Sequence, residues 1–419
     1  MLRIASLLLF LCAASSHGAE IRLWHSMNGV RGAAFERLVA RFNAEQAPHL
    51  PRYRVVATYK GAYDEAAVEA VTARRKPRAP HIVQASELGG AFLLEQKDVA
   101  RPLWQVMAEA GSALRVESAF GGGEELLDAE GRWLALPLGR STPVLYYNRD
   151  AFRIAMLDPA KPPATWYEMV PTLAALIAAG SECGLALAGP ASLLLENMAA
   201  WHNQAFIGPD ARLVFNNRLA VRWVSTLATW QKSGYFTHTR DAEARFAAGE
   251  CALLAASSAN YAELKSRVKF DLGIARFPYY DDFDGAPLNT LSASPALWVM
   301  AGRPRTDYDG VARFLAFFAR PDVQAEWHQK TGLVPLSAAA YELSRKQGFY
   351  AAQPGHEVAV RQLLVRGTQN WKSLRLGQFP GLRSIIDQEL ESAWQGRKTS
   401  IDALNAAVSR GNAFLERTK

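Results

Sequence analysis

Cysteine is scarce in this 419-residue sequence, which contains three cysteines and no CxxC pair. A zinc site or a catalytic cysteine is therefore not expected. Long hydrophobic runs are also lacking, because the apolar run at residues 4–14 is only about 11 residues long and a membrane-spanning helix needs about 20. Charge of one sign is only slightly in excess, since 47 Lys and Arg face 40 Asp and Glu. A net charge of +7 over this length does not predict a nucleic-acid partner.

Motifs of common enzyme classes are missing as well. The sequence has no GxSxG, no HExxH, no GxxxxGKS/T and no GxGxxG after a strand. Its eight histidines are scattered, and the one basic cluster, residues 74–78, fits a solvated helix end and has no interleaved aromatic residue. We therefore expect no catalytic residue, no metal and no cofactor, and we predict that the protein is not an enzyme. An exported phosphodiester hydrolase is the enzyme alternative, and it would need a metal cluster or an activated nucleophile.

The N-terminus predicts export. Arg3 precedes the apolar run, and the small residues 15–19 follow it, as in a secretory signal peptide cleaved near residues 18–19. Leu11 does not suit the processing that would attach a lipid to Cys12. We therefore expect a free protein of the periplasm.

Two cysteines, Cys183 and Cys251, remain in the mature chain. An even pair in an oxidising compartment is compatible with one disulfide. It is equally compatible with two small buried thiols, because free cysteine is among the most buried residue types. Both alternatives stay open from the sequence.

Hydrophobic periodicity in the N-terminal half alternates between strand and helix. Residues 21–24, 53–59 and 81–84 fit strands, and Phe35, Leu38, Val39 and Phe42 mark one face of a helix between the first two. This β-α-β-α-β order predicts a mainly parallel sheet with helices on both faces, whose ligands lie at the carboxyl ends of the strands.

Helix-boundary signals dominate further along the chain. Thr165 with Glu168 predicts a capped helix start, and residues 321–331 predict a helix that begins at a proline and ends at Gly332. Residues 399–415 predict an amphipathic helix that buries Ile401, Leu404, Val408 and Leu415.

Five segments carry a family resemblance, namely residues 24–27, 58–63, 141–148, 326–332 and 374–377. In the same order, from about Ile21 to about Arg417, the chain resembles the periplasmic sn-glycerol-3-phosphate-binding proteins of bacterial ABC importers. The resemblance implies a two-lobed α/β fold of the maltose-binding type, with a mainly parallel sheet in each lobe and hinge crossings between the lobes. It also implies a monomer that captures a small anionic polyol phosphate by hinge closure, then docks on a permease pair driven by a cytoplasmic ATPase.

The domain boundaries follow from the same resemblance. After the signal peptide at residues 1–19, residues 20–132 and 287–332 are expected to form the N-terminal lobe. Residues 133–286 and 333–419 are expected to form the C-terminal lobe. The chain is expected to cross between the lobes near Trp133, Pro287 and Gly332, with the ligand cleft between the lobes.

The resemblance further implies the ligand contacts. Five residues match the family's ligand-binding positions in type, namely Tyr63, Glu87, Ser141, Ser257 and Arg383. The guanidinium of Arg383 suits phosphate oxygens, and the serine hydroxyls can donate hydrogen bonds. The carboxylate of Glu87 accepts from glycerol hydroxyls and repels phosphate. Trp166 matches a family tryptophan and is expected to cover the apolar side of the glycerol. Tyr63 and Glu87 are expected from the N-terminal lobe, and Ser257, Trp166 and Arg383 from the C-terminal lobe.

Three departures from the family pattern affect the expected ligand. Ser294 stands where the family has a glycine, and Leu333 stands where it has a ligand-contacting tyrosine. Arg140 replaces a small polar residue, and it is expected either to add a second cation at the phosphate or to face solvent. Because Leu333 could open space beside the phosphate, a glycerophosphodiester such as glycerophosphocholine is the runner-up to sn-glycerol 3-phosphate.

A neutral sugar is the remaining ligand alternative. Trp24, Tyr63, Glu87, Trp166 and Trp298 could line a sugar site, but an arginine in the cleft argues against one. Replacement of Arg383 by alanine separates the two ligand classes, because only a phosphate binder should lose most of its affinity.

Overall fold

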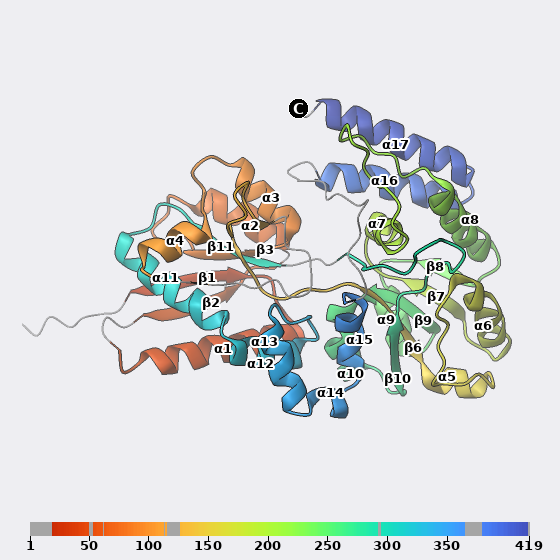
Figure 1. Ribbon diagram of the computed structural model, residues 1–419, viewed down its shortest axis with the longest axis horizontal. Coiled ribbons are helices and arrows are strands. Elements are labelled where there is room, and N and C mark those ends of the chain that lie inside the picture. Colours follow the sequence, from red (N-terminus) through yellow and green to blue (C-terminus); the bar gives the residue numbers. More distant parts are fainter. Residues whose placement is uncertain are drawn as a thin grey trace, which may run out of the picture.

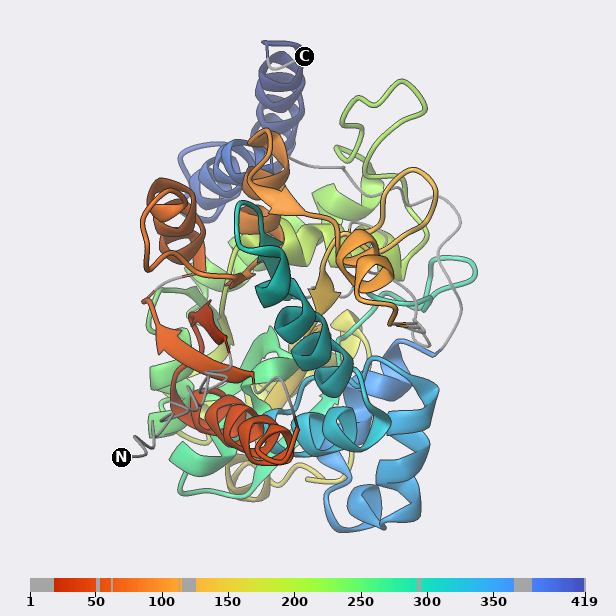
Figure 2. The same cartoon turned by 90° about the vertical axis from the view of Figure 1, so that its left-hand side faces the viewer.

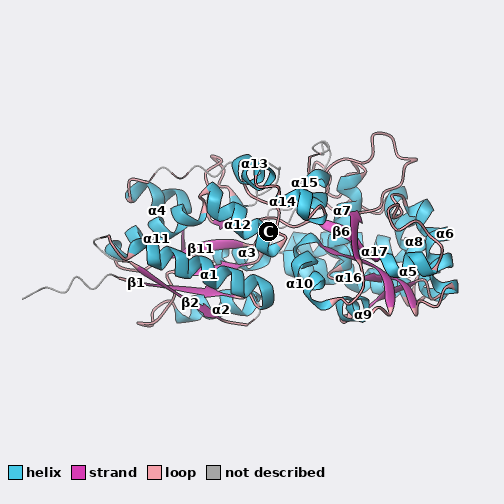
Figure 3. Cartoon of the chain, turned by 90° about the horizontal axis from the view of Figure 1, so that it is seen from below, coloured by secondary structure: helices cyan, strands magenta, loops and turns pink. Residues whose placement is uncertain are grey.

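Two lobes lie side by side in the computed structural model, which describes residues 19–49, 53–61, 63–112, 114, 126–291, 295–364 and 379–417 (Figure 1). Each lobe is built on one β-sheet flanked by helices. Seen from below, the strands of the two sheets occupy opposite ends of the molecule (Figure 3). The predicted two-lobed α/β fold is confirmed.

The first lobe contains a six-stranded sheet in the order β2-β1-β3-β11-β4, in which β5 also pairs with β11. β1 runs parallel to β2 and β3, whereas β11 is antiparallel to β3, β4 and β5. The elements are β1 (Glu20–His25), α1 (Gly29–Gln46), β2 (Arg54–Tyr59), α2 (Tyr63–Ala73), β3 (Ile82–Ala85), α3 (Glu87–Glu95), β4 (Ala100–Arg101), α4 (Leu103–Glu109), β5 (Leu136–Pro137), β11 (Ala296–Met300), α11 (Arg305–Phe318) and α12 (Pro321–Thr331).

Helices cover both faces of the first sheet. On one face α1 buries the predicted residues Phe35, Leu38, Val39 and Phe42, and it shares this core with α4, α11 and α12. On the other face α2 and α3 pack against Trp298 and its neighbours. Figure 2 looks onto this lobe, with the red α1 and the teal α11 in front.

The second lobe contains a five-stranded sheet in the order β10-β6-β9-β7-β8. β7 runs parallel to β8 and β9, whereas β6 is antiparallel to β9 and β10. The elements up to the second crossing are β6 (Pro143–Asn148), α5 (Arg149–Ile154), α6 (Trp166–Ala178), β7 (Cys183–Leu187), α7 (Ala191–Trp201), α8 (Arg218–Lys232), β8 (Phe236–His238), α9 (Ala242–Ala248), β9 (Cys251–Ser257), the 3-10 helix η2 (Ser258–Asn260), α10 (Tyr261–Arg267) and β10 (Leu272–Arg276). The helices after the third crossing are α13 (Ala338–Lys346), which packs on α12 of the first lobe, and α14 (Phe349–Ala352), α15 (Gly355–Gln362), α16 (Phe379–Trp394) and α17 (Ser400–Arg417).

Two separate cores hold the second sheet. One face packs against α6, α7, α8, α16 and α17 in a core rich in tryptophan. The opposite face packs against α9, α10 and α15. Cys183 of β7 and Cys251 of β9 are register partners and form a disulfide, with their Cα atoms 4.6 Å apart. Of the two alternatives that the sequence left open, the structure has the disulfide.

Both sheets are mixed, which corrects the prediction of mainly parallel sheets. In each sheet three neighbouring strands are parallel, β2-β1-β3 and β9-β7-β8, and the remaining pairs are antiparallel. The antiparallel strands β5, β6, β10 and β11 flank the points where the chain passes between lobes. Since no crossover helix within the same sheet joins them to the strand they pair with, nothing constrains them to run parallel.

The first passage between the lobes lies later than expected. Because β5 pairs with β11, residues 136–137 belong to the first sheet, and the chain crosses between Pro137 and Pro143 rather than near Trp133. The second passage joins β10 to β11, and the third follows the helix end at Gly332. Among the described residues, no helix is both long enough and apolar enough to cross a membrane.

Candidate functional site

Ser141 and Ser257 come together at one edge of the second sheet. In the antiparallel pair of β6 and β9, Pro143 is the register partner of Ser257. Beyond this pair, the amide of Ser258 donates to the carbonyl of Thr142 at 2.8 Å, and the amide of Thr142 donates to the Ser258 hydroxyl at 3.2 Å. The start of β6 and the end of β9 are thereby joined. The same edge holds the carboxyl ends of β7 and β8, where ligands are expected in α/β sheets.

Two hydrogen bonds fix the position of Ser257, and in both of them Ser257 is the acceptor. Its Oγ accepts a hydrogen bond from the amide of Ala259 at 3.3 Å and caps η2. Its carbonyl accepts from the hydroxyl of Tyr146 at 2.8 Å. A hydroxyl that accepts in this way keeps one proton to donate. The half-buried Ser257 therefore keeps one hydroxyl proton that could be donated at the sheet edge.

Arg383 lies on α16 against a buried carboxylate of α7. Its Nη2 is 3.2 Å from Oε2 of Glu196, and the two side chains are 12% and 5% exposed. Burial raises the pKa of Glu196, although the positive charge of Arg383 acts to lower that pKa. One helical turn further along α16, Asp387 accepts from the amide of Ser192 at 2.7 Å. Arg383 is thus a cation with two carboxylates nearby, which reduces its attraction for a strongly charged anion.

Trp166 is part of the core, and this placement corrects its assignment to the ligand. The side chain is 2% exposed and has Trp223, Trp230, Phe277 and Tyr280 as ring neighbours. It is the first residue of α6, and the N-cap residue Thr165 forms the predicted capping box with Glu168. This cap directs the tryptophan inward, so Trp166 stabilises the second lobe and does not line a surface that a ligand reaches.

Arg140 and Leu333 meet at the passages between the lobes. The backbones of Arg140 and Val334 exchange two hydrogen bonds of 3.1 and 2.7 Å, which join the first passage to the third. Arg140 is 1% exposed, so the expectation that it faces solvent is wrong. Leu333 is buried in the core of the first lobe. A Cβ at Gly139, which has φ +139°, would lie 2.9 Å from Cβ of Leu333. Leu333 therefore packs the hinge and does not open space beside a ligand.

The remaining predicted contacts are described only in part. Tyr63 and Glu87 begin α2 and α3, which follow β2 and β3 at the carboxyl edge of the first sheet. Their side chains lie outside the described residues, and so does Ser294. The backbone places both helix starts at the edge where the parallel order of the strands predicts a ligand.

The carboxyl edges of the two sheets face each other. α1 starts directly after β1, and the amide of Val30 donates to Oε2 of Glu263 on α10 at 3.4 Å. α10 in turn follows Ser257 and η2. Contact between these two segments sets the predicted ligand-binding edges of both lobes opposite each other, as a cleft between lobes requires.

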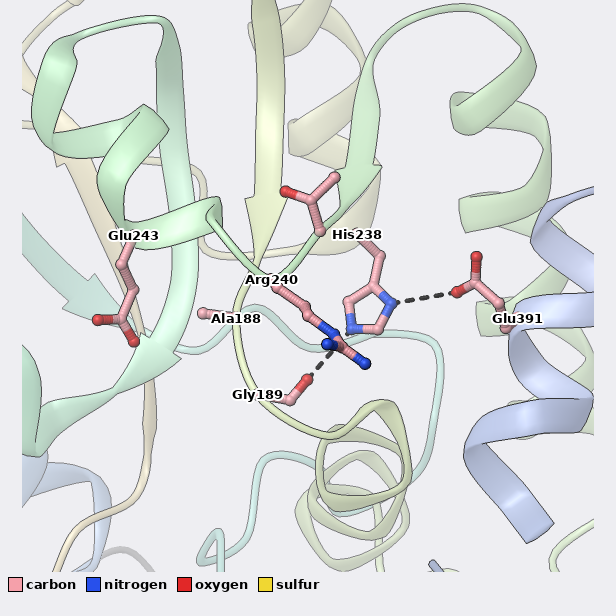
Figure 4. A pocket seen from close by; sticks show the side chains of 7 residues that line it. Ala188, Gly189, His238, Arg240, Glu243 and Glu391 are labelled. Carbon is pink, nitrogen blue, oxygen red and sulfur yellow. Dashed lines mark hydrogen bonds and ion pairs between the residues drawn. The ribbon is translucent and has the colours of Figure 1, made fainter. Parts of the chain in front are cut away.

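A pocket of about 600 Å³ opens at the same edge of the second sheet, and the sequence did not single out its residues (Figure 4). It is lined by Ala188, Gly189, His238, Thr239, Arg240, Glu243 and Glu391. These residues follow the carboxyl ends of β7 and β8 or lie on α9 and α16. The general rule for ligand position in α/β sheets was the signal that could have found them, but it was applied only to the three strands predicted in the N-terminal half. No group of three or more His, Cys, Asp or Glu residues in the described part of the chain could hold a metal ion.

A family model and two curated relatives agree on one family. A family model described as bacterial extracellular solute-binding protein matches residues 37–357. The chain is 40% identical over 412 residues to the sn-glycerol-3-phosphate-binding periplasmic protein UgpB of Yersinia pseudotuberculosis, covering 95% of this chain and 92% of that protein. It is 40% identical over 423 residues to UgpB of Escherichia coli O1:K1, covering 98% and 95%.

Solved structures share the fold over nearly the whole chain. UgpB from Mycobacterium tuberculosis in complex with glycerophosphocholine superposes with a TM-score of 0.80 at 23% identity, covering 96% of this chain and 99% of that one. Maltose-bound MalE3 of Thermotoga maritima superposes with a TM-score of 0.72 at 16% identity, covering 94% and 98%. At these identities the likeness establishes the architecture and leaves the ligand to be argued from the site.

Proposed function

The chain belongs to the bacterial extracellular solute-binding proteins, and on this premise we propose that it is the periplasmic binding subunit of an ABC importer that captures sn-glycerol 3-phosphate or one of its esters. The observation that carries the proposal is the opposed position of the two carboxyl sheet edges, with Ser257 at the end of β9 on the second. Arg383 on α16 of the same lobe is proposed as the cation of the site. Relatives 40% identical over nearly the full length, which are named for this ligand, support the same choice.

The proposed contacts divide the ligand between the lobes. On the second lobe, Arg383 provides charge-assisted hydrogen bonds to phosphate oxygens, and the hydroxyls of Ser141 and Ser257 donate to the same group. On the first lobe, Tyr63 and Glu87 are proposed to bind the glycerol hydroxyls. A ligand that contacts both lobes stabilises the closed form relative to the open form, because only the closed form makes all contacts at once.

The hinge offers a physical basis for this closure. The buried hydroxyls of Thr142 and Thr290 lie 2.5 Å apart, and Nε2 of Gln362 donates to Thr290 at 2.9 Å and to the carbonyl of Pro143 at 2.7 Å. This network fastens the first two passages to the second lobe. Bending is then confined to the short segments beyond it, which is how a few residues absorb a rotation of a whole lobe.

The proposed cycle needs no covalent chemistry. Ligand binding closes the lobes, and the closed monomer delivers the ligand to a permease pair driven by a cytoplasmic ATPase. We propose no enzymatic step and no cofactor.

A glycerophosphodiester is the second candidate, and the surroundings of Arg383 favour it. A phosphate monoester carries about −1.5 to −2 charges at pH 7, because its second pKa is about 6. A diester carries only one negative charge. Since Glu196 is 3.2 Å from Arg383 and Asp387 lies one turn along the same helix, the extra charge of a monoester is repelled more strongly.

Isothermal titration of the ligand-stripped mature protein tests the proposal. We expect sn-glycerol 3-phosphate or glycerophosphocholine to bind with micromolar or tighter affinity and maltose not to bind. Arg383→Ala should abolish most of the affinity for the phosphate compound. Binding of maltose alone, or unchanged phosphate affinity in the variant, would refute the assignment.

A further inference from the structure

The basic cluster at residues 74–78, which the proposed function does not use, lies at the edge of the first sheet opposite the predicted ligand edge. These residues connect the C-terminal end of α2 to β3. Because β1, β2 and β3 are parallel, the start of β3 lies at the amino edge of the sheet with the starts of β1 and β2. The helices α2 and α3 begin at the other, carboxyl edge, so the cluster is remote from the proposed ligand contacts of this lobe.

Two further arginines hold this connection through its backbone. Nε of Arg22 on β1 donates to the carbonyl of Ala79 at 3.0 Å. Nη2 of Arg303, which follows β11, donates to the carbonyl of Arg74. A carbonyl oxygen carries no net charge, so these bonds fix the position of the connection and leave the positive charge of both guanidinium groups in place.

The side chains of the cluster extend into solvent. All four cations of residues 74–78 are exposed, and so is the cation at the start of α11. Within the part of the chain that the structure describes, none of these exposed side chains forms an ion pair with a carboxylate. We call the following residues the basic edge: Arg74, Arg75, Lys76, Arg78, Arg303 and Arg305.

Carboxylates at the same edge of the sheet have other partners. Glu20 is 3.9 Å from Arg22, and Asp307 bonds to Nε2 of His81 at 3.0 Å. Burial lowers the pKa of His81, and the charges of Arg22 and Arg303 lower it further against the effect of Asp307, so both arginines lie near this ring. The exposed cations of residues 74–78 keep their charge, and they attract a partner with dense negative charge.

The chain enters the lobe at this same edge. The carbonyl of Ala19 accepts from the amide of Arg54 at 3.2 Å, and Glu20 is the first residue of β1. The predicted signal peptide therefore joins the lobe beside the basic edge. While that peptide is in the membrane, the basic edge is the part of the lobe closest to the bilayer.

We propose that the basic edge binds the surface of a bilayer that contains anionic phospholipids. Each Lys or Arg near such a surface strengthens adsorption, and a guanidinium group can donate two hydrogen bonds to one headgroup phosphate. The protein is thereby concentrated at the membrane through the outer end of its first lobe.

The chemistry of the basic edge favours lipid over nucleic acid. Proteins that bind single strands stack the bases on aromatic side chains, and no Phe, Tyr or Trp belongs to the basic edge. The chain also belongs to an extracellular family, away from the nucleic acid of the cell. A bilayer surface needs only cations that are exposed together, which is what the basic edge provides.

Attachment at the basic edge leaves the ligand edge uncovered. The two edges are the opposite ends of the same parallel strands, β1, β2 and β3. Membrane adsorption and ligand binding should therefore be independent, and the failure of one does not imply the failure of the other.

Sedimentation of the mature protein with lipid vesicles tests this inference. One set of vesicles is phosphatidylcholine alone, and the other is phosphatidylcholine mixed with an equal amount of phosphatidylglycerol. We expect adsorption to the anionic vesicles only. Adsorption should be lost as NaCl rises from about 0.05 M to about 0.5 M, because salt shortens the range of the electrostatic attraction.

A triple variant, Arg75→Gln with Lys76→Gln and Arg78→Gln, removes exposed charge from the basic edge. It should weaken adsorption at least about tenfold, because each cation near an anionic bilayer contributes roughly fivefold. The matched control on the second lobe is Lys232→Gln with Arg267→Gln and Lys269→Gln, whose side chains are also exposed. The control lowers the net charge equally and should change adsorption by less than about twofold. Thermal melts establish that both variants are folded.

The outcomes either support the proposal or overturn it. Equal weakening by the two triple variants would show that net charge drives adsorption and that the basic edge has no special part. Absence of adsorption to the anionic vesicles, or equal adsorption to both kinds of vesicle, would also refute the proposal. A DNA duplex that releases the protein from the vesicles at equal phosphate concentration would assign the basic edge to nucleic acid instead.

Discussion

Arg383 has a structural partner as well as a proposed ligand, and the two roles can be separated by experiment. In Arg383→Ala, the carboxylate of Glu196 loses its cation while it stays 5% exposed. Breaking a buried ion pair by removing one partner costs about 3–5 kcal/mol. The protein can limit this cost by protonating Glu196, because burial already raises the pKa of that carboxyl group.

The upper limit of the electrostatic cost follows from the free energy of protonation. From the ordinary carboxyl pKa of 4.5, taking up a proton at pH 7 costs about 3.4 kcal/mol at 1.36 kcal/mol per pH unit. At pH 5 the same step costs about 0.7 kcal/mol. A carboxyl group with a raised pKa destabilises the folded state as pH rises above 4.5, because the folded state then binds more protons than the unfolded state. R383A should therefore lose about 3 kcal/mol at pH 7 and less than about 1 kcal/mol at pH 5 through this charge.

Urea unfolding of R383A and of the double variant Arg383→Ala with Glu196→Gln measures the effect. The double variant has no buried charge, so its free energy of unfolding should return to within about 1 kcal/mol of wild type at pH 7. Its affinity for sn-glycerol 3-phosphate should stay as low as that of R383A, because the phosphate still lacks its cation. If the double variant recovers no stability, or R383A is equally unstable at pH 5 and pH 7, the account of Glu196 is refuted.

Three further predictions concern the disulfide, the buried histidines His328 of α12 and His356 of α15, and Leu333. Removal of the Cys183–Cys251 disulfide, which closes a loop with a sequence separation of 68, should lower the free energy of unfolding by about 4 kcal/mol, measured by urea unfolding with and without reductant. Burial lowers the pKa of His328 to about 4 and that of His356 to about 3, so both histidines are neutral when folded. Because the unfolded state binds these protons first, stability should fall as pH decreases from about 6.5 towards 4, and His328→Gln should reduce that slope in urea unfolding curves recorded across this range. Leu333→Ala should cost about 2–5 kcal/mol of stability and change the affinities for all ligands by one common factor, whereas a ligand contact would change the ratio between monoester and diester in titrations.

Local signals in the sequence predicted local structure well. Thr165 caps α6 through the expected capping box with Glu168, and α12 begins at Pro321 and ends at Gly332 in the left-handed conformation. Each of these signals acts within one or two helical turns, where the competing conformations are few. The two-lobed fold came from the resemblance, because the number and order of strands do not by themselves state how a chain divides between lobes.

Signals that depend on packing between distant elements were less informative. Trp166 is the first residue of a capped helix, and the sequence does not state whether that end faces the cleft or the core. Ile401 lies on the apolar face predicted for α17 but is 55% exposed, in the first turn of the helix. Of the pocket residues, Arg240 lies in the short connection after β8 and Glu243 in the first turn of the short helix α9, and neither periodicity nor a motif marks them.

The positions of Arg140 and Leu333 change how the departures from the family pattern bear on function. Both residues are buried where the first and third passages pair, Arg140 with its backbone bonded to Val334 and Leu333 packed on Gly139. Side chains that pack where the chain passes between the lobes affect the free-energy difference between the open and the closed form. When only a fraction of molecules is competent to bind, the apparent dissociation constant equals the intrinsic value divided by that fraction. A change at Leu333 that acts only through this equilibrium is therefore expected to scale the affinity for every ligand by one common factor.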